Sequence, residues 1–129
     1  MKFIFSRTQP IHQRHSTPYH TPGNYPFGYF VDGKLIGFTS LTDVDSGTYE
    51  MNDVAILPEY RHFGYGKSLL DFCKEKVVEL GGNKITIGIV DENTVLKDWY
   101  GTNGFIHTGI KRYEHLPFTV GYMEWVLEQ

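Results

Sequence analysis

Hydrophobic and polar residues alternate in changing patterns along this chain, and the first clear pattern predicts a hairpin. From Phe27, the apolar runs FGYFV and KLIGFTSL are separated by Asp32-Gly33, a dipeptide typical of a two-residue turn between antiparallel strands. The run TYEMNDVAIL follows Asp45-Ser46-Gly47 and predicts a longer strand, which ends at Pro58 because proline cannot donate a ladder hydrogen bond. KFIFS, at the start, suits another short strand.

The spacing becomes helical in KSLLDFCKEKVVEL. Charged residues occupy one face of this segment. The apolar positions recur three or four residues apart on the other face: Leu69, Leu70, Cys73, Val77 and Leu80. Gly81-Gly82 supplies a C-terminal stop, and KITIGIV then predicts a strand rich in β-branched residues. A helix between two strands indicates a parallel βαβ unit that includes the strand at 48–57.

The last third of the chain predicts one more helix and a final strand. Asn93 or Thr94 is suited to cap a short helix that ends near Gly101 and leads into FIHTGIK, and the aromatic run FTVGYMEWVL predicts the strand. The expected fold is therefore α/β: one domain over residues 1–129, with a mixed β-sheet flanked by two helices.

Residues 8–26 fit no regular pattern. They hold four prolines and three histidines with no apolar period, which predicts an irregular loop. His12, His15 and His20 have loose spacing and no accompanying cysteine or aspartate, so we expect no metal site.

Composition narrows the classes of partner. The chain has 129 residues, 21% of them charged, and a net charge of -3 with no polycationic stripe, so nucleic acid is not an expected partner. No apolar run reaches the roughly 18 residues needed to cross a membrane. The apolar start stops at Ser6 and Arg7, too early for a signal peptide, and a lone Cys73 cannot form an internal disulfide. We therefore expect a cytoplasmic protein.

The stretch YRHFGYGKSLL joins a predicted strand to a predicted helix through a glycine-rich turn. Such a turn leaves the first N–H groups of the helix unpaired and favours an anion. Two phosphate-binding patterns do not fit, because the nucleoside-triphosphate loop needs a glycine at Arg61 and the dinucleotide fingerprint needs one at Leu69. The pattern [Q/R]-x-x-G-x-[G/A] does fit, with Arg61, Gly64 and Gly66 at its fixed positions.

With this motif the sequence resembles the GCN5-related N-acetyltransferases, and NTVLKDWYGTNGF is similar to a later segment of the same family. The resemblance covers about residues 27–127. It implies the acyl-CoA N-acyltransferase (GNAT) fold, with acetyl-CoA as acyl donor. Family members usually place one or two helices between their first two strands, whereas this chain has only residues 8–26 there, so a shortened N-terminal helical region is expected.

The resemblance also implies how acetyl-CoA is held. Backbone N–H groups of the glycine-rich turn would bind its pyrophosphate, the end of the preceding strand would pair with the pantetheine arm, and Asn93 would hydrogen-bond that arm. The implied cofactor-binding residues are Ala55, Ile56, Leu57, Arg61, His62, Phe63, Gly64, Tyr65, Gly66, Lys67, Asn93 and Tyr100.

Two residues are expected to carry the chemistry. Glu50, five positions before Ala55, corresponds to the family's general base, acting directly or through water, with Asp53 as a rival that strand alternation puts on the opposite face unless a bulge intervenes. Tyr100 corresponds to the tyrosine that protonates the departing thiolate. A backbone N–H near Ile56 would stabilise the oxyanion, and Cys73 is expected to be a buried, inert thiol.

The resemblance thus implies an N-acetyltransferase that moves an acetyl group directly to a primary amine of an unidentified acceptor, either a small molecule or a protein. One alternative is a non-catalytic module that binds or senses acyl-CoA. Another is an interaction protein, since the aromatic residues of the final strand suit a homodimer interface as well as a core: Phe118, Tyr122, Met123 and Trp125.

Overall fold

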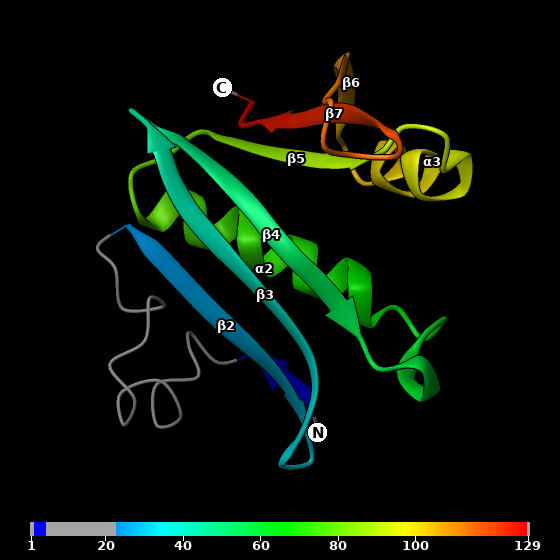
Figure 1. The fold of residues 1–129 in the computed structure, drawn as a ribbon. Coiled ribbons are helices and arrows are strands. Elements are labelled where there is room, and N and C mark those ends of the chain that lie inside the picture. Colours follow the sequence, from blue (N-terminus) through cyan, green and yellow to red (C-terminus); the bar gives the residue numbers. More distant parts are fainter. Residues whose placement is uncertain (1, 5–22, 129) are drawn as a thin grey trace.

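The computed structural model describes residues 2–4 and 23–128, which form a seven-stranded mixed sheet (Figure 1). The strands are β1 (Lys2–Ile4), β2 (Asn24–Val31), β3 (Lys34–Asp45), β4 (Thr48–Ile56), β5 (Lys84–Val90), β6 (Ile106–Arg112) and β7 (Thr119–Val126). The helices are the short 3-10 helix η2 (Pro58–Tyr60), α2 (Tyr65–Glu79) and α3 (Thr94–Thr102). The strand order is β1-β2-β3-β4-β5-β7-β6, so the last strand of the chain lies between β5 and β6.

The predicted hairpin is confirmed. Asp32 and Gly33 both have positive φ, 50° and 82°, as a primed two-residue turn between β2 and β3 requires. The predicted loop at 8–26 is wrong at its end, because β2 begins at Asn24 and includes Pro26. β1 pairs only with Tyr29–Val31, so Pro26 lies where β2 has no described neighbour on that side, a position that tolerates a missing N–H. Residues 8–22 lie outside the described residues.

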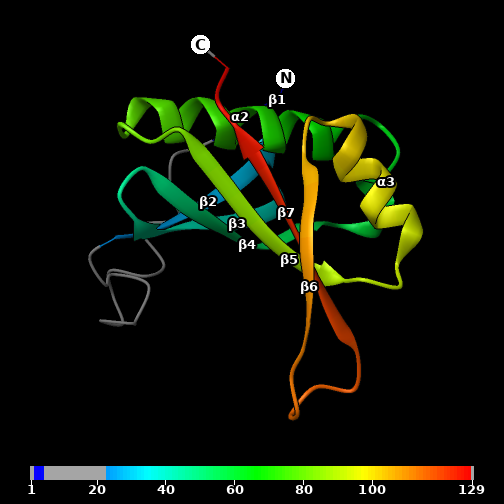
Figure 2. The ribbon, with the colours of Figure 1, turned by 90° about the horizontal axis from the view of Figure 1, so that it is seen from above.

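Helix α2 covers one face of the sheet and carries the main core, as its apolar period predicted (Figure 2). Leu69, Leu70, Cys73 and Val77 are its buried residues, and they pack against the inward side chains of the central strands. Among the described residues no helix covers the opposite face. In the same part of the chain, no helix is long and apolar enough to cross a membrane.

The two central strands separate soon after they begin. β4 and β5 are parallel, as predicted for the βαβ unit, but only Thr48–Glu50 pairs with Lys84–Thr86. β4 then continues beside β3, and β5 continues beside β7, so the strands diverge as a V that is visible in Figure 1. From Met51 onward, β4 has no β5 partner. This leaves backbone groups of two strands facing a shared opening.

A bulge interrupts β4 just where the V opens. Phe38 pairs with Ala55 and Ser40 pairs with Asn52, so one residue of β3 lies opposite two residues of β4. Asp53, in the bulge, has a φ of 54°, and Thr39 Oγ1 donates a 2.9 Å hydrogen bond to the carbonyl of Asn52. The bulge therefore breaks the alternation of side chains along β4.

Candidate active site

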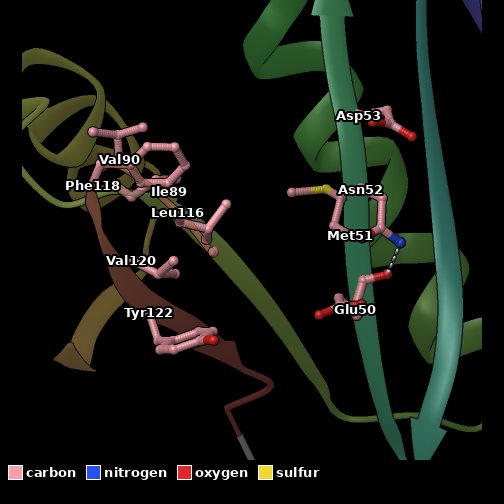
Figure 3. Close-up of a pocket in the computed structure, with 11 residues that line it drawn as sticks. Glu50, Met51, Asn52, Asp53, Ile89, Val90, Leu116, Phe118, Val120 and Tyr122 are labelled. Carbon is pink, nitrogen blue, oxygen red and sulfur yellow. Dashed lines mark hydrogen bonds between the residues drawn. The ribbon is translucent and has the colours of Figure 1, made fainter. Parts of the chain in front are cut away.

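A cavity of about 430 Å³ lies in the V between β4 and β5 (Figure 3). Its polar side chains come from β4 and β7: Glu50, Asn52, Asp53 and Tyr122. Its apolar side chains come from β4, β5, β7 and the loop before β7: Met51, Ile89, Val90, Leu116, Phe118 and Val120. Gly88 completes the lining. The cavity thus joins polar groups to a predominantly apolar wall, which is typical of a small-molecule site.

The sheet register sets the polar wall. Glu50 pairs with Thr42 and Asn52 pairs with Ser40, which puts both side chains on the face opposite α2. The Asn52 amide donates to Thr42 Oγ1 at 3.2 Å and lies 3.5 Å from the Glu50 carbonyl oxygen. Asn52 is therefore held by β3 and β4 and braces the strand beside the Glu50 carboxylate.

Asp53 lines the same cavity as Glu50. Strict alternation along β4 would put Glu50 and Asp53 on opposite faces of the sheet. Both line the cavity because the bulge interrupts that alternation. Both carboxylates that the sequence offered as base are therefore present at the opening of the V.

Tyr122 is a site residue whose position the sequence did not reveal. It pairs with Gly88 on β5, which puts it on the same face of the sheet as Glu50, and the two side chains point toward one another in Figure 3. Its hydroxyl hydrogen-bonds the hydroxyl of Tyr113. That hydrogen bond, followed by burial and the charges of Tyr113 and Glu50, raises the pKa of Tyr122. The alternation of side chains along β7 puts Tyr122 on one face of that strand. Only the register of β7 against β5 shows that this face is the one that carries Glu50.

The N-terminus of α2 has the features of an anion site. Gly64, with a φ of 85°, is its N-cap, and the first helical hydrogen bond runs from the Ser68 N–H to the Gly64 carbonyl at 3.1 Å. No side chain caps the helix, and the N–H groups of Gly64, Gly66 and Lys67 have no partner among the described residues. Unpaired N–H groups at the positive end of a helix dipole fit a phosphate.

The residues before this helix tie it to the end of β4. Arg61 Nε donates to the Ile56 carbonyl at 3.0 Å, and the Leu57 N–H donates to the Ile36 carbonyl at 2.8 Å. The fixed Arg61 of the motif therefore braces the strand end through its side chain. His62, with a φ of 68°, turns the chain into the helix, and Phe63 is exposed.

Ala55 and Ile56 pair with β3 on one side, and their other side faces the opening, because β5 has departed. This edge follows directly from the polar wall and runs toward the N-terminus of α2. An extended ligand with amide groups would find here a strand edge with which no described residue pairs.

Helix α3 lies against the first turn of α2. A Cβ placed on Gly66 would lie 3.1 Å from Cζ2 of Trp99, so the two helices are in close contact there. Asn93 caps α3, as predicted, by accepting a 3.0 Å hydrogen bond from the Leu96 N–H. Its side-chain NH₂ is not used by the cap.

Tyr100 is buried next to this contact rather than in the cavity wall. It is 5% exposed, and its ring lies edge-on to Trp99 and Phe105 at centroid distances of 5.0 and 5.4 Å. Burial, with a smaller contribution from Cys73, raises the pKa of Tyr100 to about 12. No described residue hydrogen-bonds its hydroxyl. The structure thus places Glu50 and Asp53 in the lining of one cavity, whereas Tyr100 is the residue of α3 that is buried in the core.

Cys73 is buried, as predicted, and burial raises the pKa of its thiol to about 12. A thiol that stays protonated is a poor nucleophile. Within residues 2–4 and 23–128, no group of three or more His, Cys, Asp or Glu side chains is arranged to hold a metal ion. The three histidines of segment 8–26 lie outside the described residues.

The profile of the acetyltransferase (GNAT) family matches residues 2–105. The chain belongs to this family. It is 26% identical, over 108 residues, to an uncharacterized N-acetyltransferase in the pepI 3′ region of Lactobacillus delbrueckii subsp. lactis. That match covers 78% of the chain and 60% of the relative, so the chain aligns with only about three fifths of that protein's length.

Solved structures show the same fold. A GNAT family acetyltransferase from Elizabethkingia anophelis with acetyl-CoA bound superimposes with a TM-score of 0.83 at 17% identity, covering 98% of both chains. A putative streptothricin acetyltransferase from Bacillus anthracis str. Ames in complex with acetyl coenzyme A gives 0.76 at 20% identity, covering 84% of this chain and 65% of the other. The family and the fold predicted from the sequence are therefore confirmed.

Proposed function

We propose that this chain transfers the acetyl group of acetyl-CoA directly to the nitrogen of a primary amine. The observation that supports this best is the continuity of three features: unpaired N–H groups at the N-terminus of α2, an unpaired edge of β4, and a cavity with two carboxylates where β4 and β5 separate. They match the three parts of the reaction in order, since the phosphates, the extended arm and the reacting carbonyl of acetyl-CoA also follow one another along one molecule.

The N–H groups from Phe63 to Lys67 hold the pyrophosphate in this proposal, with Arg61 and His62 shaping the turn. Ala55, Ile56 and Leu57 lie along the pantetheine arm, and the free NH₂ of Asn93 donates to it. Acetyl-CoA is bound in both solved relatives described above, which supports the same ligand here.

Acetyl-CoA supplies an acetyl group activated as a thioester, so transfer forms one amide bond and breaks one carbon–sulfur bond. Glu50 takes the proton that the amine loses, directly or through water, with Asp53 as the alternative base. A backbone N–H near Ile56 donates to the carbonyl oxygen as negative charge develops on it. On the family resemblance alone, since it does not line the cavity, Tyr100 gives the departing sulfur its proton. With its pKa raised to about 12, the hydroxyl is protonated at neutral pH.

The binding step is tested by calorimetric titration with acetyl-CoA of the wild type, Gly64→Trp and Gly33→Trp. Both glycines have similar positive φ, 85° and 82°, and an added Cβ would meet no atom within 4 Å at either position, so backbone strain and the room for a Cβ are matched. Only Gly64 lies at the proposed pyrophosphate site. We expect Gly64→Trp to weaken binding by at least about tenfold and Gly33→Trp to leave it unchanged. Equal effects of the two variants, or no binding by the folded wild type, would refute the proposal.

Turnover separates the enzyme from a non-catalytic acyl-CoA module. Release of free CoA thiol is followed while primary amines are added to wild-type protein saturated with acetyl-CoA. Binding together with amine-dependent thiol release supports the transferase. Tight binding without amine-dependent release would favour a sensing module.

A further inference from the structure

The two sides of the cavity differ in chemistry. The lining residues of β4 include Glu50, Asn52 and Asp53, and in Figure 3 the Glu50 carboxylate points toward the facing wall. Apart from Tyr122, that wall, from β5, β7 and the loop before β7, is apolar: Val90, Leu116, Phe118 and Val120. A molecule that fills the space in Figure 3 would therefore contact anionic groups at one end and hydrocarbon at the other.

No lysine, arginine or histidine lines the cavity among the described residues. Two lysines lie on neighbouring strands without lining the cavity: Lys84 lies 3.6 Å from a Glu124 carboxylate oxygen, and Lys111, which pairs with Val120, lies over the Tyr113 ring, 5.0 Å from its centroid. An entering carboxylate or phosphate would meet carboxylates with no cation in the described lining, which is unfavourable in a partly desolvated site. The carboxylates of the lining therefore favour a cationic ligand over an anionic one.

The Tyr113–Tyr122 pair would orient a bound ammonium group. Because Tyr113 holds the Tyr122 hydroxyl, that oxygen has a fixed position opposite Glu50. A neutral hydroxyl oxygen accepts a hydrogen bond from an ammonium group, and a carboxylate accepts a stronger one. An ammonium between them would be oriented from two sides, with the rest of the molecule directed to the apolar wall.

We propose that the acceptor is a primary ammonium carried on an apolar or aromatic body that bears no anionic group. This rests on the proposed function, in that it takes the cavity as the acceptor site. The nitrogen lies between Glu50 and Tyr122, the body lies against Leu116, Phe118 and Val120, and Tyr113 is a positioning residue that acts through Tyr122.

Three probes test this class: 2-phenylethylamine, L-phenylalanine, which adds a carboxylate to the same body, and spermidine, which replaces the aromatic body with further cations. We compare kcat/KM for CoA release, and we measure binding of each probe to the CoA-saturated wild type by calorimetry. The expected preference for 2-phenylethylamine over L-phenylalanine is at least about tenfold in both measurements. Equal or better use of L-phenylalanine would overturn the proposal, as would a preference for spermidine, whose second cation would lie on the apolar wall.

The two measurements separate this proposal from the proposed function. Selective binding of 2-phenylethylamine without any turnover would leave the acceptor class standing and remove the transferase. Turnover of other amines, with no binding or use of 2-phenylethylamine, would support the transferase and refute the proposed acceptor class. If the CoA-saturated protein binds none of the probes, the acceptor class is refuted.

A charge placed in the cavity gives an independent test. Val120→Lys puts a cation on the wall, whereas Val126→Lys makes the same change on the same face of β7 outside the cavity, where Val126 is 46% exposed. We expect the preference for 2-phenylethylamine over L-phenylalanine to fall at least about tenfold in Val120→Lys and to persist in Val126→Lys. An unchanged preference in a folded Val120→Lys protein would contradict the electrostatic argument.

Tyr113→Phe tests positioning. We expect KM for 2-phenylethylamine to rise while kcat and the affinity for acetyl-CoA stay near the wild-type values, because Tyr122 keeps its place in β7 but loses its partner. A lower stability with unchanged KM would mean that Tyr113 is only structural.

Discussion

Replacing Tyr100 by phenylalanine should lower kcat for acetyl transfer without lowering the free energy of unfolding. The ring is 5% exposed and packs edge-on against Trp99 and Phe105, contacts that phenylalanine retains. Its hydroxyl has no hydrogen-bond partner among the described residues. Burying such a hydroxyl costs roughly 1–3 kcal/mol, so its removal should leave the free energy of unfolding unchanged or raise it by about 1 kcal/mol.

The substitution Tyr100→Phe is expected to lower kcat, although it leaves stability unchanged or raises it. If Tyr100 protonates the departing sulfur, its loss should lower kcat by at least about 100-fold, which corresponds to about 2.7 kcal/mol of transition-state stabilisation. Because the pKa of Tyr100 is raised to about 12, its ionisation should not appear in a pH–rate profile between pH 6 and 10. Only above that range should activity fall through loss of the acid form.

The assay pairs urea denaturation with CoA-release kinetics, and Tyr49→Phe is the matched control. Tyr49 is also 5% exposed and its pKa is also raised, first by burial, but it lies near the start of β4, away from α3. We expect Tyr49→Phe to leave kcat unchanged. An unchanged kcat in Tyr100→Phe would refute its role as acid, and a loss of more than about 1 kcal/mol of stability would show that its hydroxyl has a partner.

Three further predictions concern the base, the core thiol and a tightly packed glycine. Glu50→Gln should lower kcat by about 100-fold while the calorimetric affinity for acetyl-CoA is unchanged, and an undiminished kcat would remove Glu50 as base. Since the thiol pKa of Cys73 rises from 9.0 to about 12 on folding, its contribution to stability is complete below pH 9 and is lost as pH rises toward 12. Unfolding free energies measured at pH 8, 9 and 10 should therefore fall less in Cys73→Ala than in the wild type, and parallel slopes would contradict this. A Cβ on Gly82 would lie 2.7 Å from the Tyr49 ring, so Gly82→Ala should cost about 1–3 kcal/mol and lower Tm by about 4 °C per kcal/mol, whereas Gly109→Ala, with no atom within 4 Å, should be near neutral.

Local sequence patterns predicted most elements because their causes are local. The Asp32-Gly33 turn needs positive φ at both positions, and the apolar period of 67–80 gives α2 a buried stripe whatever it packs against. The start of β2 was missed by three residues, because Pro26 suggests a loop unless the neighbouring strand is known to stop before it.

The proposed cofactor half of the site belongs to this local class as well. The glycine N-cap with a φ of 85°, and the N–H groups of Gly66 and Lys67 that have no described partner, follow from the residues between β4 and α2 alone. The sequence therefore predicted the position of a candidate anion site before any strand was placed.

The acceptor half depends on pairings between distant residues, which the sequence does not specify. Side chains alternate along a strand, but their shared face depends on register, and the bulge at Asp53 and the insertion of β7 between β5 and β6 both alter it. Glu50 was a candidate through its spacing to Ala55 in the family resemblance, whereas Tyr122 became a candidate site residue only through its pairing with Gly88. The sequence by itself determined the elements, the family and the glycine-rich turn before α2, because these follow from local backbone and packing preferences. Only the tertiary structure decided which side chains share the cavity, because that depends on long-range strand pairing.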